Sequence, residues 1–271
     1  MNATEKQDLE RRRLEGWCQT PETRIADPAG GVALLNRTGL ATLYPASSEI
    51  PNLFHAYMGD PNAKTDSRHT SPSGRVYGWR WALGRDQAAF YGVLIRKRTT
   101  YVAWPLLPAV LRLRADFHTP DELFDLGSIS IDAYRITQAL EAAGGSLSTP
   151  ALRDAAGFPT GKAQRNAYLK ALDELDARLL IAKNFAADDG DTRHTLIALA
   201  HPDQLAEAEA MSEEDALDSL LRTYLPNAIY AEPRVLSRHL KVPEQSLRPA
   251  LQRLVAEGAA VQSDDWFVCA A

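Results

Sequence analysis

The sequence predicts a mainly helical α+β protein with short β-hairpins, arranged as three tandem winged-helix (helix-turn-helix) domains. Two stretches of the chain each contain three amphipathic helices followed by two short strands, the element order of a winged helix. A proline stands near the start of the second helix in both stretches, at Pro150 and Pro233. The two stretches lie too far apart for a short-period solenoid, and their spacing indicates a repeated domain.

The clearest pattern covers the domain expected over residues 128–203. Its first helix should begin after Ser130, which suits an N-cap, and should stop at Gly144-Gly145. A short second helix should have Thr149 as its N-cap and Pro150 at its first position, where the missing N–H costs nothing.

The third helix of this domain, KAQRNAYLKALDELDARL, is apolar on one side only. Tyr168, Leu172, Leu175 and Leu179 recur at helical spacing, so we expect them to be buried. Two strands joined by an acidic turn at residues 188–191 should follow. In a winged helix the third helix is the one that can enter a major groove, whereas an acidic wing tip would repel phosphate.

The third domain is expected over residues 204–271. Its first helix should start after Ser212, and its last two strands should turn around residues 263–265. We expect its third helix to have Ser246 as N-cap, because Pro249 would then lie in the first turn, where a backbone N–H has no partner.

The N-terminal part predicts a helix over residues 1–19 and a divergent first winged helix over residues 20–127. Within it, residues 59–78 are rich in Pro, Ser, Asp and Asn and predict a long inserted loop. The basic LERRRLE section of the first helix is interpreted as a solvated face. The apolar residues of segment 88–95 suggest a helix, and TTYVAW suggests a strand.

Composition excludes several classes of function. No run of about 18 apolar residues is present, so no membrane span is expected, and the charged N-terminus lacks the apolar core of a signal peptide. Cys18 and Cys269 have no metal or disulfide spacing, and the six histidines match no zinc pattern. We therefore expect a cytoplasmic protein, a monomer, with no metal and no cofactor. Its net charge of −5 means that any DNA-binding surface must be a local basic patch.

Residue types that bind phosphates or base edges are concentrated in two segments, the aromatic and basic stretch 77–104 and the third helix of the second domain. The candidate DNA-binding residues are Arg80, Arg85, Arg96, Lys97, Arg98, Lys162, Gln164, Arg165, Asn166, Lys170 and Arg238. For Arg80, Arg85 and the basic run 96–98, a phosphate site and a solvated turn are equal alternatives. Nearby aromatic residues could stack on an extruded base, but a core role is the more frequent one; these are Trp79, Trp81, Tyr101 and Trp104.

A hydrolytic site would need a carboxylate beside a pocket. Glu49, Asp60 and Asp116 flank apolar segments and are the weak candidates, although no pairing distinguishes them from ordinary surface acids.

Three winged-helix units with little else attached resemble the AlkZ-like (YcaQ-like) winged-helix DNA glycosylases, and more closely the smaller AlkZ-related proteins of bacteria. The resemblance also rests on the segment from GWRWALG through YGVLIRKRTTYVAWPLLP and on LKALDELDARLLIAK. It implies a concave basic surface for duplex DNA and a Gln-x-Gln or Gln-x-Asp motif that positions the attacking water. Here the matching segment 39–45 has Thr42 and Tyr44 where the polar pair should stand, and neither residue supplies the same acceptors.

The sequence therefore predicts a duplex-DNA-binding protein related to DNA-repair glycosylases and without the family's catalytic motif. Three alternatives stay open: an active glycosylase with a non-standard acid, a winged-helix transcription regulator, and a protein-interaction scaffold. The lesion, DNA sequence or partner is not specified by any of these residues.

Overall fold

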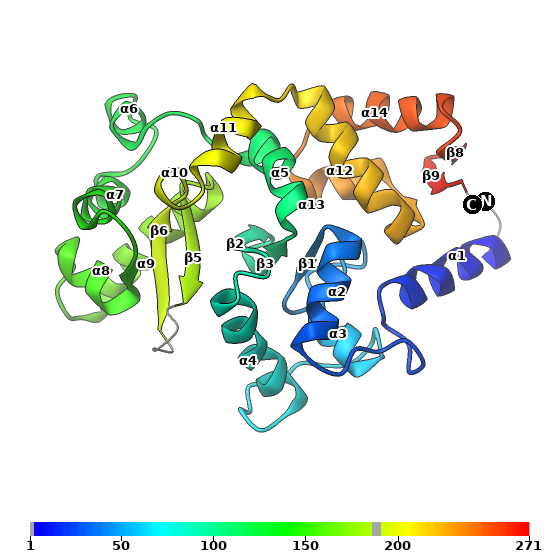
Figure 1. Cartoon of the computed structure of the whole chain (residues 1–271), viewed down its shortest axis with the longest axis horizontal. Coiled ribbons are helices and arrows are strands. Elements are labelled where there is room, and N and C mark those ends of the chain that lie inside the picture. The colour runs from blue at the N-terminus through cyan, green and yellow to red at the C-terminus, as the bar shows by residue number, and fades with distance from the viewer. Residues whose placement is uncertain (1–2, 186–190, 271) are drawn as a thin grey trace.

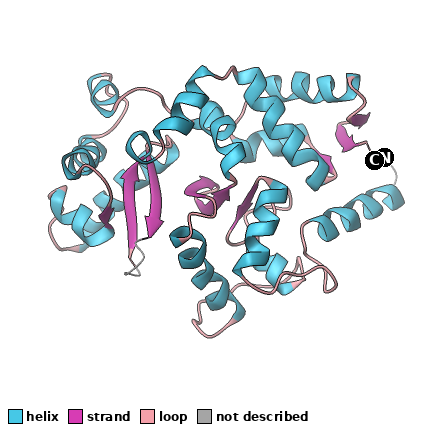
Figure 2. Ribbon diagram, viewed as in Figure 1, coloured by secondary structure: helices cyan, strands magenta, loops and turns pink. Residues whose placement is uncertain are grey.

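The computed structural model describes residues 3–185 and 191–270. The chain is mostly helical and contains three small antiparallel sheets, seen as separate groups of arrows in Figure 2. Each sheet has three strands, and in each the last strand lies between the other two. Each sheet also accompanies three helices in the same order, so the expected winged-helix topology is confirmed three times along the chain.

The second unit follows the sequence prediction most closely. Its elements are α7 (Ile131–Ala143), β4 (Leu147–Ser148), α8 (Thr149–Ala155), α9 (Lys162–Ala177), β5 (Ile181–Phe185) and β6 (Thr192–Leu196). Ser130 caps α7 through a bond to the Ala133 N–H, and Gly144 ends it in the left-handed conformation. The N-cap of α8 is Ser148 and not Thr149, a displacement of one residue. Residues 188–190 of the predicted acidic turn lie outside the described residues.

The third unit has the same topology but a different helix start. Its elements are α12 (Glu213–Ala228), β7 (Tyr230–Ala231), α13 (Pro233–Leu240), α14 (Glu244–Ala256), β8 (Ala260–Ser263) and β9 (Trp266–Cys269). The prediction that Ser246 caps the third helix is wrong. This helix begins at Glu244 after Pro243, so Pro249 lies inside it. Ser212 is the N-cap of α12, as expected.

The first unit is the divergent one, and two predictions fail there. Its elements are α2 (Pro28–Thr38), β1 (Leu40–Thr42), α3 (Leu53–Met58), α4 (Pro72–Arg85), β2 (Phe90–Ile95) and β3 (Arg98–Val102). The apolar segment 88–95 contains strand β2 and no helix, because a strand buried on both sides has a continuous apolar run that periodicity cannot separate from a helix. The predicted loop 59–78 ends at Ser71, which caps α4.

The remaining elements connect the units. They are α1 (Ala3–Gly16), η1 (Trp104–Leu106), α5 (Leu107–Arg114), α6 (Pro120–Asp125), α10 (Ile197–Ala200) and α11 (Pro202–Ala210). Figure 1 shows α5 between the second unit and α12 of the third. One hydrophobic core runs from the first unit through α5 into the third unit, whereas most of the second unit has a core of its own. None of the described helices is long and apolar enough to cross a membrane.

The second unit is nevertheless fastened to the first through its own β-sheet. Phe185 of β5 is buried in the core of the first unit, stacked on Tyr91 with ring centroids 5.8 Å apart. It also lies directly over Gly84 of α4, where an added Cβ would stand 2.3 Å from the phenyl ring. Only glycine allows this approach, so the third helix of the first unit is partly covered by the second unit.

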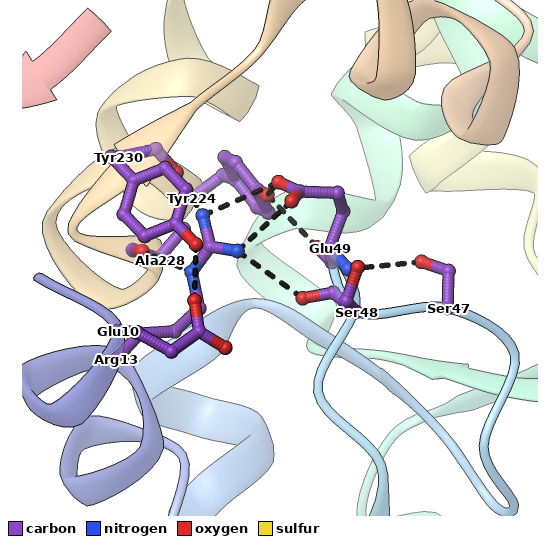
Figure 3. Close-up of polar contacts among 8 residues, drawn as sticks. All are labelled: Glu10, Arg13, Ser47, Ser48, Glu49, Tyr224, Ala228 and Tyr230. Carbon is purple, nitrogen blue, oxygen red and sulfur yellow. Dashed lines mark hydrogen bonds and ion pairs between the residues drawn. The ribbon is translucent and has the colours of Figure 1, made fainter. Parts of the chain in front are cut away.

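A buried ion pair joins α1 to the first and third units (Figure 3). The Arg13 side chain is fully buried, and its guanidinium binds both carboxylate oxygens of Glu49 at 2.9 and 3.3 Å. It also donates to the carbonyls of Ala228 and Tyr230, while the Tyr224 hydroxyl donates to Glu49. The predicted solvated face of LERRRLE is therefore wrong at Arg13, because its charge is satisfied by residues too distant in sequence for any local pattern to reveal.

His194 of β6 gives the fold a dependence on pH. Burial, followed by the nearby Lys183 charge, lowers the pKa of His194 to about 3. The unfolded chain takes up this proton near its ordinary pKa of about 6.5, so the stability present above that pH is lost as the pH falls toward the folded pKa. Between about pH 7 and pH 5, the free energy of unfolding should fall by about 2 kcal/mol more for the parent than for His194→Gln. Urea titrations of both proteins at each pH measure the difference, and parallel decreases would contradict the assignment.

Candidate nucleic-acid interface

The exposed side of α9 is polar and basic over its first half, from Lys162 to Lys170, and acidic at Asp173 in its second half. Five of the candidate DNA-binding residues lie on this exposed side: Lys162, Gln164, Arg165, Asn166 and Lys170. Their side chains make no hydrogen bond or ion pair with any described residue. The opposite side is buried as predicted, with Leu172 7% and Leu175 0% exposed. The buried stripe fixes the rotation of α9, and its free polar groups consequently point outward.

The tight turn between β2 and β3 brings a second group of cations to α9. Arg96 and Lys97 both have positive φ, at 47° and 60°, in a two-residue turn that ordinarily favours Asn and Gly. Lys97 Nζ lies 2.7 Å from Asp173 Oδ2 on α9. Two charged residues at positive φ carry backbone strain that Asn or Gly would avoid at this turn.

Arg96 faces the other way, toward the end of α13 in the third unit. It donates to the Ala46 carbonyl at 2.8 Å. Burial is the largest cause that lowers the pKa of His239, and the charges of Arg96 and Arg238 lower this pKa further. Burial, followed by the charges of Arg114 and Lys97, likewise lowers the pKa of Lys241. The turn therefore lies between α9 of the second unit and the cations at the end of α13 in the third unit.

Arg114 is a member of this group that the sequence analysis missed. It lies in the last turn of α5 and donates to the Leu240 carbonyl at 3.1 Å. Its position depends on the packing of α5 against the third unit, for which the sequence offered no signal.

The two candidate arginines of α4, Arg80 and Arg85, have different surroundings. Arg80 is half-buried between aromatic rings, with its guanidinium 3.7 Å from the Tyr77 ring centroid and 4.2 Å from that of Trp81. Arg85 is exposed at the helix end. Of the four aromatic candidates, Trp79 and Tyr101 are buried, which confirms the core interpretation for these two. Trp81 and Trp104 are half-buried.

The third helix of the third unit carries its cations in ion pairs. Arg248 binds Glu244 at 2.6 Å, and Arg253 binds Glu214 at 3.1 Å. Arg238 on α13 is exposed and has no side-chain partner among the described residues. The third unit therefore presents free cations mainly at the end of α13.

A cavity of about 720 Å³ opens beside α4 in the first unit. Its wall consists of the segment 61–69, the first turn of α4, and the side chains of Tyr44, His55, Tyr77 and Arg98. Arg98 belongs to the same basic run as Arg96 and Lys97, so the cavity is connected to the basic turn. Asp66 holds the segment in place through bonds to Ser71 and Arg68.

None of the three candidate acids lines this cavity. Glu49 is buried against Arg13, Asp60 is exposed, and Asp116 binds Arg178 at 2.9 Å and His118 at 2.8 Å. Burial alone would raise the pKa of Asp116, but its bonds to His118 and Arg178 lower it overall.

Asp66, which the sequence analysis did not consider as a catalytic acid, is the acid that does line the cavity. The hydrogen bonds from the Ser71 hydroxyl and from Arg68 lower the pKa of Asp66. Asp66 is therefore a carboxylate whose oxygens already accept hydrogen bonds from these two residues. Among the described residues, no group of three His, Cys, Asp or Glu side chains could hold a metal ion.

The two positions that stand where the glycosylase motif would lie are also separated. Thr42 on β1 is fully buried, and its hydroxyl has no partner among the described residues. Tyr44 is half-buried, lines the cavity, and donates to the Ser73 carbonyl at 2.7 Å. Only Tyr44 of this pair reaches the cavity.

Comparison with known proteins gives two matches of different kinds. A family model described as "AlkZ related" matches residues 25–241. The structure of the DNA glycosylase AlkZ from Streptomyces sahachiroi is similar with a TM-score of 0.55, covering 95% of this chain and 69% of that one. The two sequences are 14% identical, so this likeness concerns the fold. No curated protein matches the sequence.

Proposed function

Because the chain belongs to the AlkZ-related family, we propose that it binds duplex DNA in the cytoplasm without excising bases. The proposed surface runs from the exposed side of α9, over the turn at Arg96 and Lys97, to the end of α13. The similar fold of a DNA glycosylase supports DNA as the partner.

The observation that carries this proposal is the contact between Lys97 and Asp173. It joins the basic turn of the first unit to α9, whose cations have no partners among the described residues. An exposed ion pair contributes little to stability, so phosphate can replace Asp173 as the partner of Lys97 at small cost. The resulting patch is local, which agrees with the net charge of −5.

The proposed loss of catalysis rests on the cavity. A glycosylase water needs an acceptor such as a carboxylate or carboxamide. Thr42 is fully buried in the core. The Tyr44 hydroxyl donates to the Ser73 carbonyl, and the Asp66 carboxylate accepts from Ser71 and Arg68.

We expect weak duplex binding that depends steeply on salt, because cations that neutralise phosphates release counterions. Lys162→Ala and Lys170→Ala should each weaken binding and reduce the slope of log K against log salt by about one. Fluorescence anisotropy across a salt series measures both effects. Arg222→Ala is the matched control, because Arg222 lies on α12 and is held by Asp218 and Glu257. Binding absent at about 50 mM salt, or independent of salt, would favour a protein-interaction scaffold.

A separate expectation concerns excision. The purified protein should release no 7-methylated purine and unhook no crosslink above background, because the one carboxylate that lines the described cavity, Asp66, already binds Ser71 and Arg68. Chromatography of released bases on alkylated duplex provides the measurement. Release that disappears in Asp66→Asn but persists in Asp60→Asn would refute the expectation and identify the acid.

A further inference from the structure

The wall of the cavity beside α4 contains both aromatic rings and cations, and a single ligand could contact both. Two tyrosine rings, Tyr44 and Tyr77, form part of the wall. Two cations, Lys64 and Arg98, are exposed at the same cavity, and neither side chain has a partner among the described residues. Its volume of about 720 Å³ falls within the range of small-molecule sites, about 300–1,000 Å³.

The wall is preformed and does not depend on a ligand for its shape. Asp66 N–H donates to the Ser73 hydroxyl at 3.0 Å, and the His69 carbonyl lies so close to Gly74 that an added Cβ would be 2.1 Å from it. His55 accepts from Asn52 at Nδ1 and donates from Nε2 to the Ala63 carbonyl, so both of its ring nitrogens are occupied. The His55 imidazole is therefore already engaged, whereas the two cations are free to bind a ligand.

Aromatic rings beside free cations match a ligand with a flat ring and a phosphate. The connection to the basic turn indicates how such a ligand would arrive, since Arg98 is the residue after Arg96 and Lys97. A nucleotide inside a duplex is stacked and paired, so only an unpaired one could place its ring in the cavity. We propose that this cavity holds the base of one unpaired nucleotide of a bound DNA strand, with its phosphate on Arg98 and Lys64. This inference rests on the proposed DNA binding.

The test compares a fully paired duplex with the same duplex carrying a single bulged 2-aminopurine. The parent protein should bind the bulged duplex about tenfold more tightly, since stacking on an aromatic ring stabilises one base by that order. It should also change the emission of the 2-aminopurine. Thr65→Trp, at an exposed position on the rim, should obstruct the cavity and reduce the preference while leaving paired-duplex binding unchanged.

Two arginine variants distinguish binding in the cavity from a general effect of positive charge on DNA binding. Arg98→Ala should reduce the preference, whereas Arg75→Ala, which removes the same charge from an exposed position of α4 outside the cavity wall, should keep it. Equal affinity of the parent for both duplexes would overturn the inference and leave the proposed DNA binding standing.

A third arm tests the source of the nucleotide. If neither duplex binds, the proposed function fails. Titration with deoxyadenosine monophosphate then tests whether the cavity binds a nucleotide without any duplex. Binding of that nucleotide by the parent and not by Thr65→Trp would retain the cavity as a site for free nucleotides. No binding in this arm would overturn the inference.

Discussion

Replacing Arg13 by methionine should destabilise the protein by about 3–5 kcal/mol, because the change leaves the Glu49 carboxylate buried without its cation. The exposed fraction of Glu49 is 5%, so water cannot replace the lost partner. The carbonyls of Ala228 and Tyr230 lose a donor in the same step (Figure 3). Urea denaturation followed by circular dichroism measures the change in free energy of unfolding.

The matched control is Arg11→Met on the same helix. Arg11 is exposed and pairs with Asp8 and Glu15 within α1, so its loss should cost less than about 0.5 kcal/mol. The double variant Arg13→Met, Glu49→Leu should recover part of the stability, because no unpaired charge then stays buried. An Arg13→Met protein as stable as Arg11→Met would show that the ion pair contributes nothing.

The second large effect separates the two sides of α9. Leu172→Ala and Leu175→Ala should each cost about 2–5 kcal/mol, since truncation removes apolar contact and leaves a cavity. Leu175 is fully buried in the core of the second unit. Lys162→Ala and Lys170→Ala should each change stability by less than about 0.5 kcal/mol, as exposed substitutions usually do. Thermal melts of the four single variants rank them.

The lysine variants also test function independently of folding. If α9 contacts DNA, both lysine variants should melt like the parent and bind DNA less tightly. Lysine variants that fold normally and bind as well as the parent would remove α9 from the proposed interface. The winged-helix fold would be unaffected by that result.

The sequence predicts well where a pattern is local. The caps at Ser130 and Ser212, the buried stripe of α9 and the paired last strands of the second and third units all follow from neighbouring residues, and the structure confirms each. The exposed candidates on α9 could be named for the same reason, because a regular helix displays whatever its buried stripe does not contain.

The failures occur where distant segments decide the outcome. Strand β2 was predicted as a helix, since an apolar run contains no information about what covers it. Arg13 was predicted to be solvated, although Glu49 and the third unit enclose it. The cavity could not be foreseen, because its wall joins Tyr44, the segment 61–69 and Arg98 only after the chain folds.

The close approach of Phe185 to Gly84 bears on how this chain can be dissected. A fragment ending after the first unit would lack the phenyl ring that covers α4 and would leave Tyr91 open to water. A fragment beginning at the second unit would expose Phe185 on its outer strand, a site for aggregation. The repeats are therefore not interchangeable, and truncated variants or chimaeras made at the boundaries between units would have exposed interfaces that the native chain buries.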